Sequence, residues 1–414
     1  MRICIPRNST ASKMHNFFIL LLLVLSVLVT FLDNSLNIFF YMVLIGMYLY
    51  YKALKDHFKY YKYQILVLIY ALITIGTTIV HQIMGEGFSF QMVWRPIRII
   101  LSFSVGFYYA KYSDENSRKK LYSTLLILIL LSVAYGFYQY YTGTGWGYNS
   151  RMDSYFGHPI VYGGITIIGF WLTFYAVNND RWILKLALSA FILAGMISSG
   201  SRSTWIAFVL SVIIFLLKSR RHKMNRKAFY ILIFILCLFI GFMFTPYFAN
   251  IYSLIEARFS GSLAGVSASQ RLGSYPYIFN QIGNSNLFDV VFGHGEGAAQ
   301  AVMGNTTISI ASFYTTDSQY LTLLYDYGLI AIFILFAYLI QIARDYFDSD
   351  NKANSELCIL AVAIISAGFI ASVFYDLFGW LSISTVICIL SGICFYLHHF
   401  SVVNMRREHN DTSI

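Results

Sequence analysis

Charged side chains are scarce in this sequence. Asp, Glu, Lys and Arg make up 12% of the 414 residues, whereas soluble domains carry about a quarter. Hydrophobic residues reach 58%, and Phe, Trp and Tyr together reach 18%. This composition excludes a soluble globular protein. It predicts an all-α integral membrane protein with aromatic residues at the membrane interfaces.

Cysteines and motifs for metals or nucleotides are also few. The five cysteines fall in the N-terminal tail or inside apolar runs, so neither a disulfide framework nor a CxxC metal site is indicated. The sequence contains no convincing HExxH, P-loop, DxD-type or nucleophile-elbow motif. We therefore expect no metal and no cofactor.

Long apolar runs are abundant instead. A membrane-crossing helix needs about 20 apolar residues, and about twelve runs approach this length. The first run has no small-residue cleavage site after it, so we interpret it as an uncleaved anchor. The twelve expected spans are residues 15–32, 36–54, 63–81, 93–110, 121–141, 160–177, 182–198, 203–217, 228–249, 319–343, 356–375 and 379–399.

One connection is much longer than the others. Residues 250–318, between spans 9 and 10, are rich in Gly and Ser, and long loops without function are uncommon. Apolar residues recur in this loop at helical spacing, which predicts a short amphipathic helix on the membrane or over the bundle. They are Leu272, Tyr275, Phe279 and Ile282. The expected parts are 1–249 with spans 1–9, the extracytoplasmic loop 250–318, and 319–414 with spans 10–12 and a cytoplasmic tail.

The basic residues divide unequally between the two sides of the membrane. With both termini in the cytoplasm, 23 of the 29 Lys and Arg residues lie on the inner side, as the positive-inside rule requires. The net charge of +10 is thus mostly orientation charge, so we expect no nucleic-acid partner. All six outer basic residues are arginines, namely Arg95, Arg98, Arg151, Arg202, Arg258 and Arg271. Because a guanidinium stays charged and binds phosphate through two hydrogen bonds, this outer face predicts a phosphate site.

The expected helix starts support an anion site. Spans 4, 6, 8 and 10 begin at the outer face, where their N-terminal dipoles favour negative charge. Arg95 and Arg98 lie on one face of the first turn of span 4, and Arg202 lies in the tight turn before span 8. Each of these arginines has an alternative role as an anchor to lipid headgroups. Arg271 opens the amphipathic element, and Arg151 is less constrained; both have the alternative of solvated surface charge.

Few outer acids and histidines are candidates for acid–base chemistry. Asp317 directly precedes span 10 and has two alternatives, a helix N-cap and a general base. His294 and Glu296 lie in the run GHGEG, which could bend around a ligand but is a weak motif. His158, before Pro159, is a second candidate, and we assign it with Tyr320 to glycan contacts.

Three segments resemble one known family. The segments SSGSRSTW, RLGSYPYIFNQIGNSNLFDVVFGHGEG and DSQYLTLLYDYGLI resemble the bacterial O-antigen ligase and polysaccharide polymerase (Wzy) superfamily. The resemblance implies a GT-C-like fold of twelve spans, with both termini cytoplasmic and a large outer loop between spans 9 and 10. It implies metal-independent glycan transfer from undecaprenyl diphosphate to a sugar hydroxyl, outside the cytoplasmic membrane. Arg202 and Arg271 would hold the diphosphate, with Arg95, Arg98 and Arg151 as further candidates.

The resemblance has one departure. Ligases of the family carry a His and a small polar residue before the span that follows the large loop, where this chain has Asp317-Ser318. We therefore expect a polymerase of O-antigen, capsule or exopolysaccharide, with Asp317, His294 or Glu296 as the base. A ligase is the alternative. A flippase-type transporter would need internal repeats and mid-membrane charges, and a scaffold would not need outer arginines. Expected partners are the lipid-linked oligosaccharide, membrane lipid, a flippase and a chain-length regulator.

Overall fold

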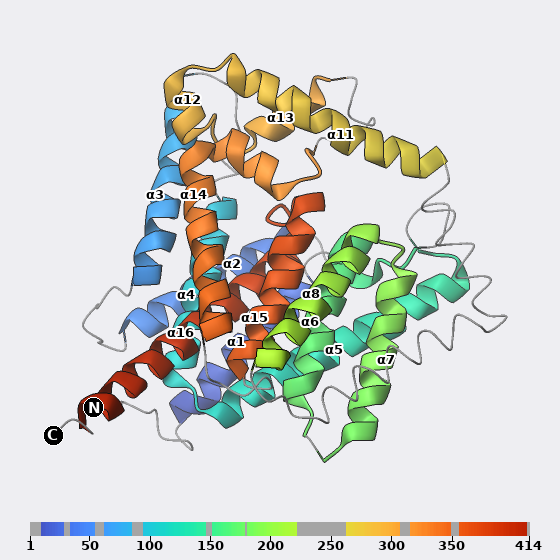
Figure 1. Ribbon diagram of the computed structural model, residues 1–414, viewed down its shortest axis with the longest axis vertical. Coiled ribbons are helices and arrows are strands. Elements are labelled where there is room, and N and C mark those ends of the chain that lie inside the picture. The colour runs from blue at the N-terminus through green and yellow to red at the C-terminus, as the bar shows by residue number, and fades with distance from the viewer. Residues whose placement is uncertain are drawn as a thin grey trace.

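The computed structural model is a bundle of helices (Figure 1). It describes residues 10–28, 34–53, 62–84, 94–145, 151–178, 180–221, 262–306, 315–348 and 356–411. The helices of the first half are α1 (Thr10–Leu28), α2 (Asn34–Ala53), α3 (Lys62–Ile83), α4 (Trp94–Tyr112), α5 (Glu115–Thr142), η2 (Ser154–Phe156), α6 (Pro159–Ala176), α7 (Trp182–Ser198) and α8 (Arg202–Arg221). Those of the second half are α11 (Ser262–Gly283), α12 (Leu287–Phe292), α13 (Ala298–Gly304), α14 (Gln319–Asp348), α15 (Glu356–Ile364), the π-helical η3 (Ile365–Ile370), η4 (Ala371–Phe374) and α16 (Leu381–Asp411).

The expectation of an all-helical membrane protein is confirmed, since the described part of the chain contains helices and no strand. Five of the described helices are long and apolar enough to cross a membrane. They are Glu115–Thr142, Pro159–Ala176, Gln319–Arg344, Glu356–Phe374 and Leu381–His398. Span 9, predicted at residues 228–249, lies outside the described residues, so the count of twelve stays a prediction.

The helices that follow the predicted loop boundary lie across one end of the bundle. Figure 1 shows α11, α12 and α13 there, and the C-terminal end of α16 at the opposite end. We call these the loop end and the opposite end. At the opposite end, the Glu356 carboxylate joins three helices: it pairs with Arg118 at 2.7 Å and accepts hydrogen bonds from Tyr122 at 2.6 Å and Tyr175 at 3.3 Å.

The closest packing in the bundle is between α4 and α16, where glycines face the neighbouring backbone. A Cβ atom on Gly106 would lie 2.1 Å from the Ile389 carbonyl oxygen, and one on Gly392 would lie 2.1 Å from that of Phe103. Small residues at such a crossing let two backbones touch, which is the main source of helix association in membranes. This contact holds the middle of α4 against α16; Arg95 and Arg98 lie in the first turn of the same helix.

Helix α14 is interrupted near the loop end. Gly328 has φ 69° and ψ −171°, a conformation open mainly to glycine. The break frees two carbonyl groups of the preceding turn: that of Tyr325 accepts from His294 N at 3.0 Å, and that of Asp326 accepts from Gly295 N at 2.8 Å. A Cβ atom on Gly328 would lie only 2.3 Å from the Val291 carbonyl oxygen. The broken turn therefore binds and positions the segment between α12 and α13.

The predicted loop helix is present as α11, but it is longer than expected. It runs for 22 residues, so Arg271 lies within it and does not open it. Within the predicted apolar stripe, Leu272 is 74% and Phe279 54% accessible, whereas Ile282 packs with Ile278 against residues of α13 and α14. Contact of the exposed part of the stripe with the membrane stays a prediction.

We predict that Gly328→Ala destabilises the protein. The new Cβ would clash with the Val291 backbone, and a positive φ costs about 1–3 kcal/mol for a residue with a side chain. The matched control is Gly46→Ala in α2, where no atom lies within 4 Å of the new Cβ. Thermal unfolding of the detergent-solubilised protein measures both. An unchanged midpoint for Gly328→Ala would show that the break does not depend on glycine.

Candidate functional site

The loop of residues 375–380, between η4 and α16, closes the bundle at the loop end. Gln319 ties it to the start of α14: its backbone N donates to the Tyr375 carbonyl at 3.2 Å, and its Oε1 accepts from Phe378 N at 2.6 Å. Arg98 ties the loop to α4 by donating to the Phe378 carbonyl at 2.6 Å. Arg98 is 6% exposed, so this candidate phosphate ligand lies inside the bundle as a tie between elements.

Arg95 and Glu296 form an ion pair. Arg95 Nη1 lies 2.7 Å from Glu296 Oε1, and the Glu296 side chain is 2% exposed. Thr78 of α3 accepts a hydrogen bond from the Glu296 backbone N at 3.0 Å. Burial raises the pKa of the Glu296 carboxyl to about 7, and the charge of Arg95 opposes this rise. The structure thus joins a predicted phosphate ligand to one of the candidate bases.

Asp326 explains how Glu296 is positioned. Its carboxylate accepts from Ala299 N at 2.7 Å and from Gly297 N at 3.1 Å. A carboxylate in this place satisfies free N–H groups of the first turn of α13 and complements its dipole. This capping contact gives the one ionisable residue well inside span 10 a structural role.

His294 packs between α12 and α14. Its ring stacks on Tyr325 with centroids 4.2 Å apart, and its Nε2 lies 2.9 Å from the Ser285 hydroxyl. Asp289 Oδ2 lies 3.9 Å from the same nitrogen. Both ring nitrogens have neighbours, since Nδ1 lies 3.2 Å from the Tyr325 carbonyl oxygen. The candidate base His294 is therefore held in a packed cluster with Tyr325 and Ser285.

Asp317 lies directly before α14 in a strained conformation. Its φ is 52°, which is uncommon for a residue with a side chain, and it is 8% exposed. Thr315 donates to its Oδ1 at 3.0 Å. The first helical hydrogen bond of α14 runs from Thr322 N to the Ser318 carbonyl, so Ser318 occupies the capping position and Asp317 precedes it.

Two neighbours of Asp317 were not predicted as site residues. Asp376 and Tyr375, both on the loop 375–380, lie close enough to Asp317 for an electrostatic interaction with its carboxylate. Burial raises the pKa of Asp376; Arg95 and the backbone of Gly379 oppose this rise, and Asp317 adds to it. No periodic or spacing signal marks this loop, because only the fold brings residues 317 and 376 together.

His158 opens α6 as expected. Its Nδ1 accepts from Ile160 N at 3.3 Å, and Pro159 is the first helical residue. The ring also contacts the loop 375–380, with centroid distances of 5.1 Å to Trp380 and 6.1 Å to Tyr375. The candidate glycan contact is thus part of an aromatic cluster that sequence reasoning did not find.

The remaining arginines lie in two places. Arg151 donates through Nε to the Ser199 carbonyl at 3.0 Å and through Nη2 to that of Gly200 at 3.4 Å, so it braces the turn between α7 and α8. Arg202 follows that turn as the first residue of α8 and is half-buried. Arg271 lies in α11. Arg258 lies outside the described residues.

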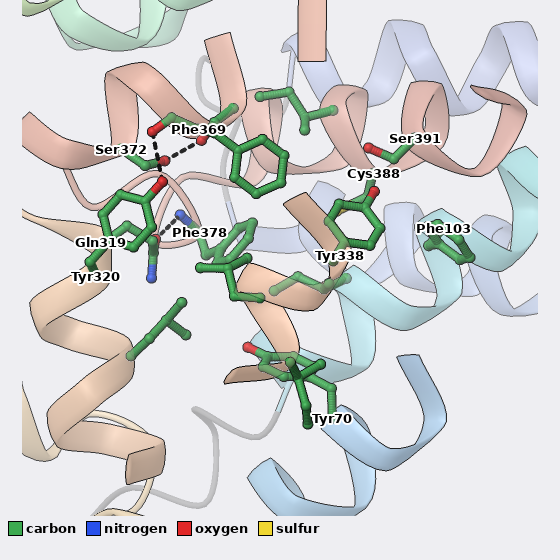
Figure 2. Close-up of a pocket in the computed structure, with 16 residues that line it drawn as sticks. Tyr70, Phe103, Gln319, Tyr320, Tyr338, Phe369, Ser372, Phe378, Cys388 and Ser391 are labelled. Carbon is green, nitrogen blue, oxygen red and sulfur yellow. Dashed lines mark hydrogen bonds between the residues drawn. The ribbon is translucent and has the colours of Figure 1, made fainter. Parts of the chain in front are cut away.

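An apolar pocket of about 90 Å³ lies beneath the loop 375–380 (Figure 2). Helices α3, α4, α14 and α16 and the η3–η4 segment line it, with Phe378 of the loop among the lining residues. Tyr320, predicted as a glycan contact, also lines it and donates to the Phe369 carbonyl at 2.9 Å. Among the residues that the structure describes, no group of three or more His, Cys, Asp or Glu could hold a metal ion.

One family model matches part of the chain. Residues 187–336 match the family model described as O-antigen ligase. This stretch holds α7, α8, α11–α13 and the start of α14, and with them Arg202, Arg271 and Asp317. No curated protein matches the chain. All three segments on which the sequence resemblance rests lie inside the matched range, so that resemblance is confirmed.

Proposed function

We propose, from the match of residues 187–336 to the O-antigen ligase family model, that this protein is a polysaccharide polymerase. It would transfer a growing glycan from undecaprenyl diphosphate to a lipid-linked repeat unit at the outer side of the bacterial cytoplasmic membrane. The observation that carries the proposal is the family match over the segments of Arg202, Arg271 and Asp317. The apolar helices agree with a membrane enzyme of this type.

Arg202 and Arg271 are the proposed diphosphate ligands. Arg202 is the first residue of α8, where free N–H groups and the helix dipole favour an anion. The turn before it is braced by Arg151. As the diphosphate leaves, negative charge develops on it, and fixed guanidinium groups stabilise that charge where it forms. We expect Arg95 and Arg98 to contribute less to diphosphate binding, because Arg95 pairs with Glu296 and Arg98 donates to the Phe378 carbonyl.

Asp317 is the proposed general base. The acceptor hydroxyl oxygen forms a bond to the anomeric carbon while the bond from that carbon to the diphosphate oxygen breaks, and the hydroxyl proton passes to a nearby base. Asp317 lies at the start of α14 beside the loop 375–380, whereas Glu296 pairs with Arg95 and His294 is stacked on Tyr325. These contacts favour Asp317 among the three candidates.

The apolar pocket supports a lipid-linked donor. It lies between membrane helices under the loop that carries Tyr375 and Asp376. Its lining is almost wholly hydrophobic, so an isoprenoid chain would lose water contact there at little polar cost. The pocket would bind the first isoprenoid units while Arg202 and Arg271 bind the diphosphate.

The experiment that tests the function is reconstitution of the whole protein in liposomes with lipid-linked repeat units. We expect glycans of increasing length, because each product would remain a donor for the next transfer. One transfer to a different acceptor would identify a ligase instead. Movement of the substrate across the bilayer without new bonds would identify a transporter.

We predict that Arg202→Lys and Arg271→Lys each lose most of the chain growth in this assay. Lysine keeps the charge but loses the planar fork that binds phosphate through two hydrogen bonds. The control is Arg181→Lys, an exposed arginine between α6 and α7. Membrane abundance should match the wild type for all three. Normal growth in both test variants would place the diphosphate elsewhere.

We predict that Asp317→Asn abolishes chain growth at unchanged membrane abundance. Asparagine keeps a side-chain oxygen that can accept the Thr315 hydrogen bond, yet it cannot take the proton of the acceptor. Glu296→Gln serves as the comparison, because it removes the charge of another candidate. Should growth persist in Asp317→Asn and vanish in Glu296→Gln, the base would be Glu296.

A further inference from the structure

We propose that His158, Tyr375, Asp376 and Trp380 form a binding subsite for a neutral sugar ring of the acceptor glycan. In this subsite the Trp380 ring covers an apolar face of the sugar, and Tyr375 and Asp376 hydrogen-bond to its hydroxyl groups. The inference rests on the proposed function, because it is the transfer reaction that supplies an acceptor glycan.

The first observation is a patch of contacting aromatic rings. The centroids of His158 and Trp380 lie 5.1 Å apart, those of His158 and Tyr375 6.1 Å, and those of Tyr375 and Trp380 6.3 Å. His158 and Tyr375 are nearly parallel, at 11°. Trp380 remains half-buried, so part of its ring is accessible at the loop end. Aromatic rings of this kind offer a broad apolar surface with a polar edge.

The second observation is unused hydrogen-bonding capacity beside these rings. The Tyr375 hydroxyl is buried, the residue being 4% exposed, and has no hydrogen-bond partner among the described residues. The same holds for Asp376 Oδ1. Buried polar atoms in folded proteins are nearly always paired, so two orphans on adjacent residues indicate a missing polar partner. A donor hydroxyl and an acceptor carboxylate together match the hydroxyl groups of a sugar.

Charge decides between kinds of sugar. Asp317 and Asp376 lie near Tyr375. Of the two α4 arginines close to this loop, Arg95 pairs with Glu296 and Arg98 donates to the Phe378 carbonyl. An acidic sugar would bring a third carboxylate to this place, and like charges at short range are strongly unfavourable. A sugar ring bearing hydroxyl groups would instead donate to the carboxylates. Its position beside Asp317 would bring one hydroxyl to the proposed base.

The alternative is that these rings only pin the loop 375–380 to α6. The substitution Tyr375→Phe separates the two interpretations. It removes an oxygen that has no partner, so a purely structural role predicts an equal or higher melting temperature and no kinetic change. A sugar-binding role predicts the same stability together with weaker acceptor binding.

The test uses the full-length protein in lipid nanodiscs with two readouts. The first is the transfer rate from a lipid-linked repeat unit to the water-soluble repeat-unit oligosaccharide, whose concentration is varied. The second is saturation-transfer NMR with that oligosaccharide alone. We expect Tyr375→Phe and Trp380→Ala to raise the KM for the soluble acceptor about five- to tenfold, the size of one lost hydrogen bond. The KM for the donor should stay unchanged.

Two matched controls are available. Trp182→Phe changes an exposed tryptophan of α7, and Tyr141→Phe changes a tyrosine of α5 that is 91% exposed. Both should keep the KM and the NMR signal of the wild type. If Trp380→Ala does not fold, Tyr375→Phe alone still decides. An acceptor KM unchanged in Tyr375→Phe, or a rise in the donor KM instead, would overturn the subsite.

The outcomes separate this inference from the proposed function. If the wild type transfers glycan and the variants do not change the acceptor KM, the proposed function is supported and the subsite is contradicted. Oligosaccharide binding that depends on Tyr375 and Trp380, without any transfer, keeps the subsite and removes the transferase. Neither binding nor transfer by the wild type removes both.

Discussion

The loop end depends on the contact between the broken turn of α14 and the segment between α12 and α13. Gly328 breaks the helix, and its freed carbonyls bind the backbone of His294 and Gly295. The Asp326 side chain, on the same turn, then caps α13. These contacts fix the segment that contains Glu296, and Glu296 forms an ion pair with Arg95 on α4. One interruption in one helix thus sets the position of a charged group on another.

Three of the predicted phosphate ligands already contact groups of the chain. Arg95 forms an ion pair with Glu296, and Arg98 and Arg151 donate hydrogen bonds to backbone carbonyl groups. Taking such an arginine for a diphosphate would leave a buried acceptor unpaired, which costs about 1–3 kcal/mol per group. The proposed assignment of the diphosphate to Arg202 and Arg271 rests on the family match over their segments. Sequence alone could not rank the six, because it shows their side of the membrane and not their partners.

The sequence predicted the helices well and the site unevenly. Apolar length located the five described helices that are long enough to cross a membrane, and Pro159 and Arg202 marked the starts of α6 and α8, because such signals act within a few residues. The break at Gly328 and the cap by Asp326 were missed, since each depends on a partner about 30 residues away. Asp376 was not predicted as a site residue. Its closeness to Asp317 arises when the bundle brings the loop 375–380 to the start of α14.

Charge is distributed at the loop end in a way that suits two different ligands. Arg202 and Arg271 lie on α8 and α11, whereas the carboxylates of Asp317 and Asp376 lie at the start of α14 and on the loop 375–380. A diphosphate is attracted by the first pair and repelled by the second, and a sugar hydroxyl that must lose its proton has the opposite preference. In the proposed reaction, the arginines would therefore attract the donor diphosphate, and the carboxylates would attract the acceptor hydroxyl. A carboxylate at position 317 fits this division, because it attracts a hydroxyl donor and adds to the field that keeps phosphate away.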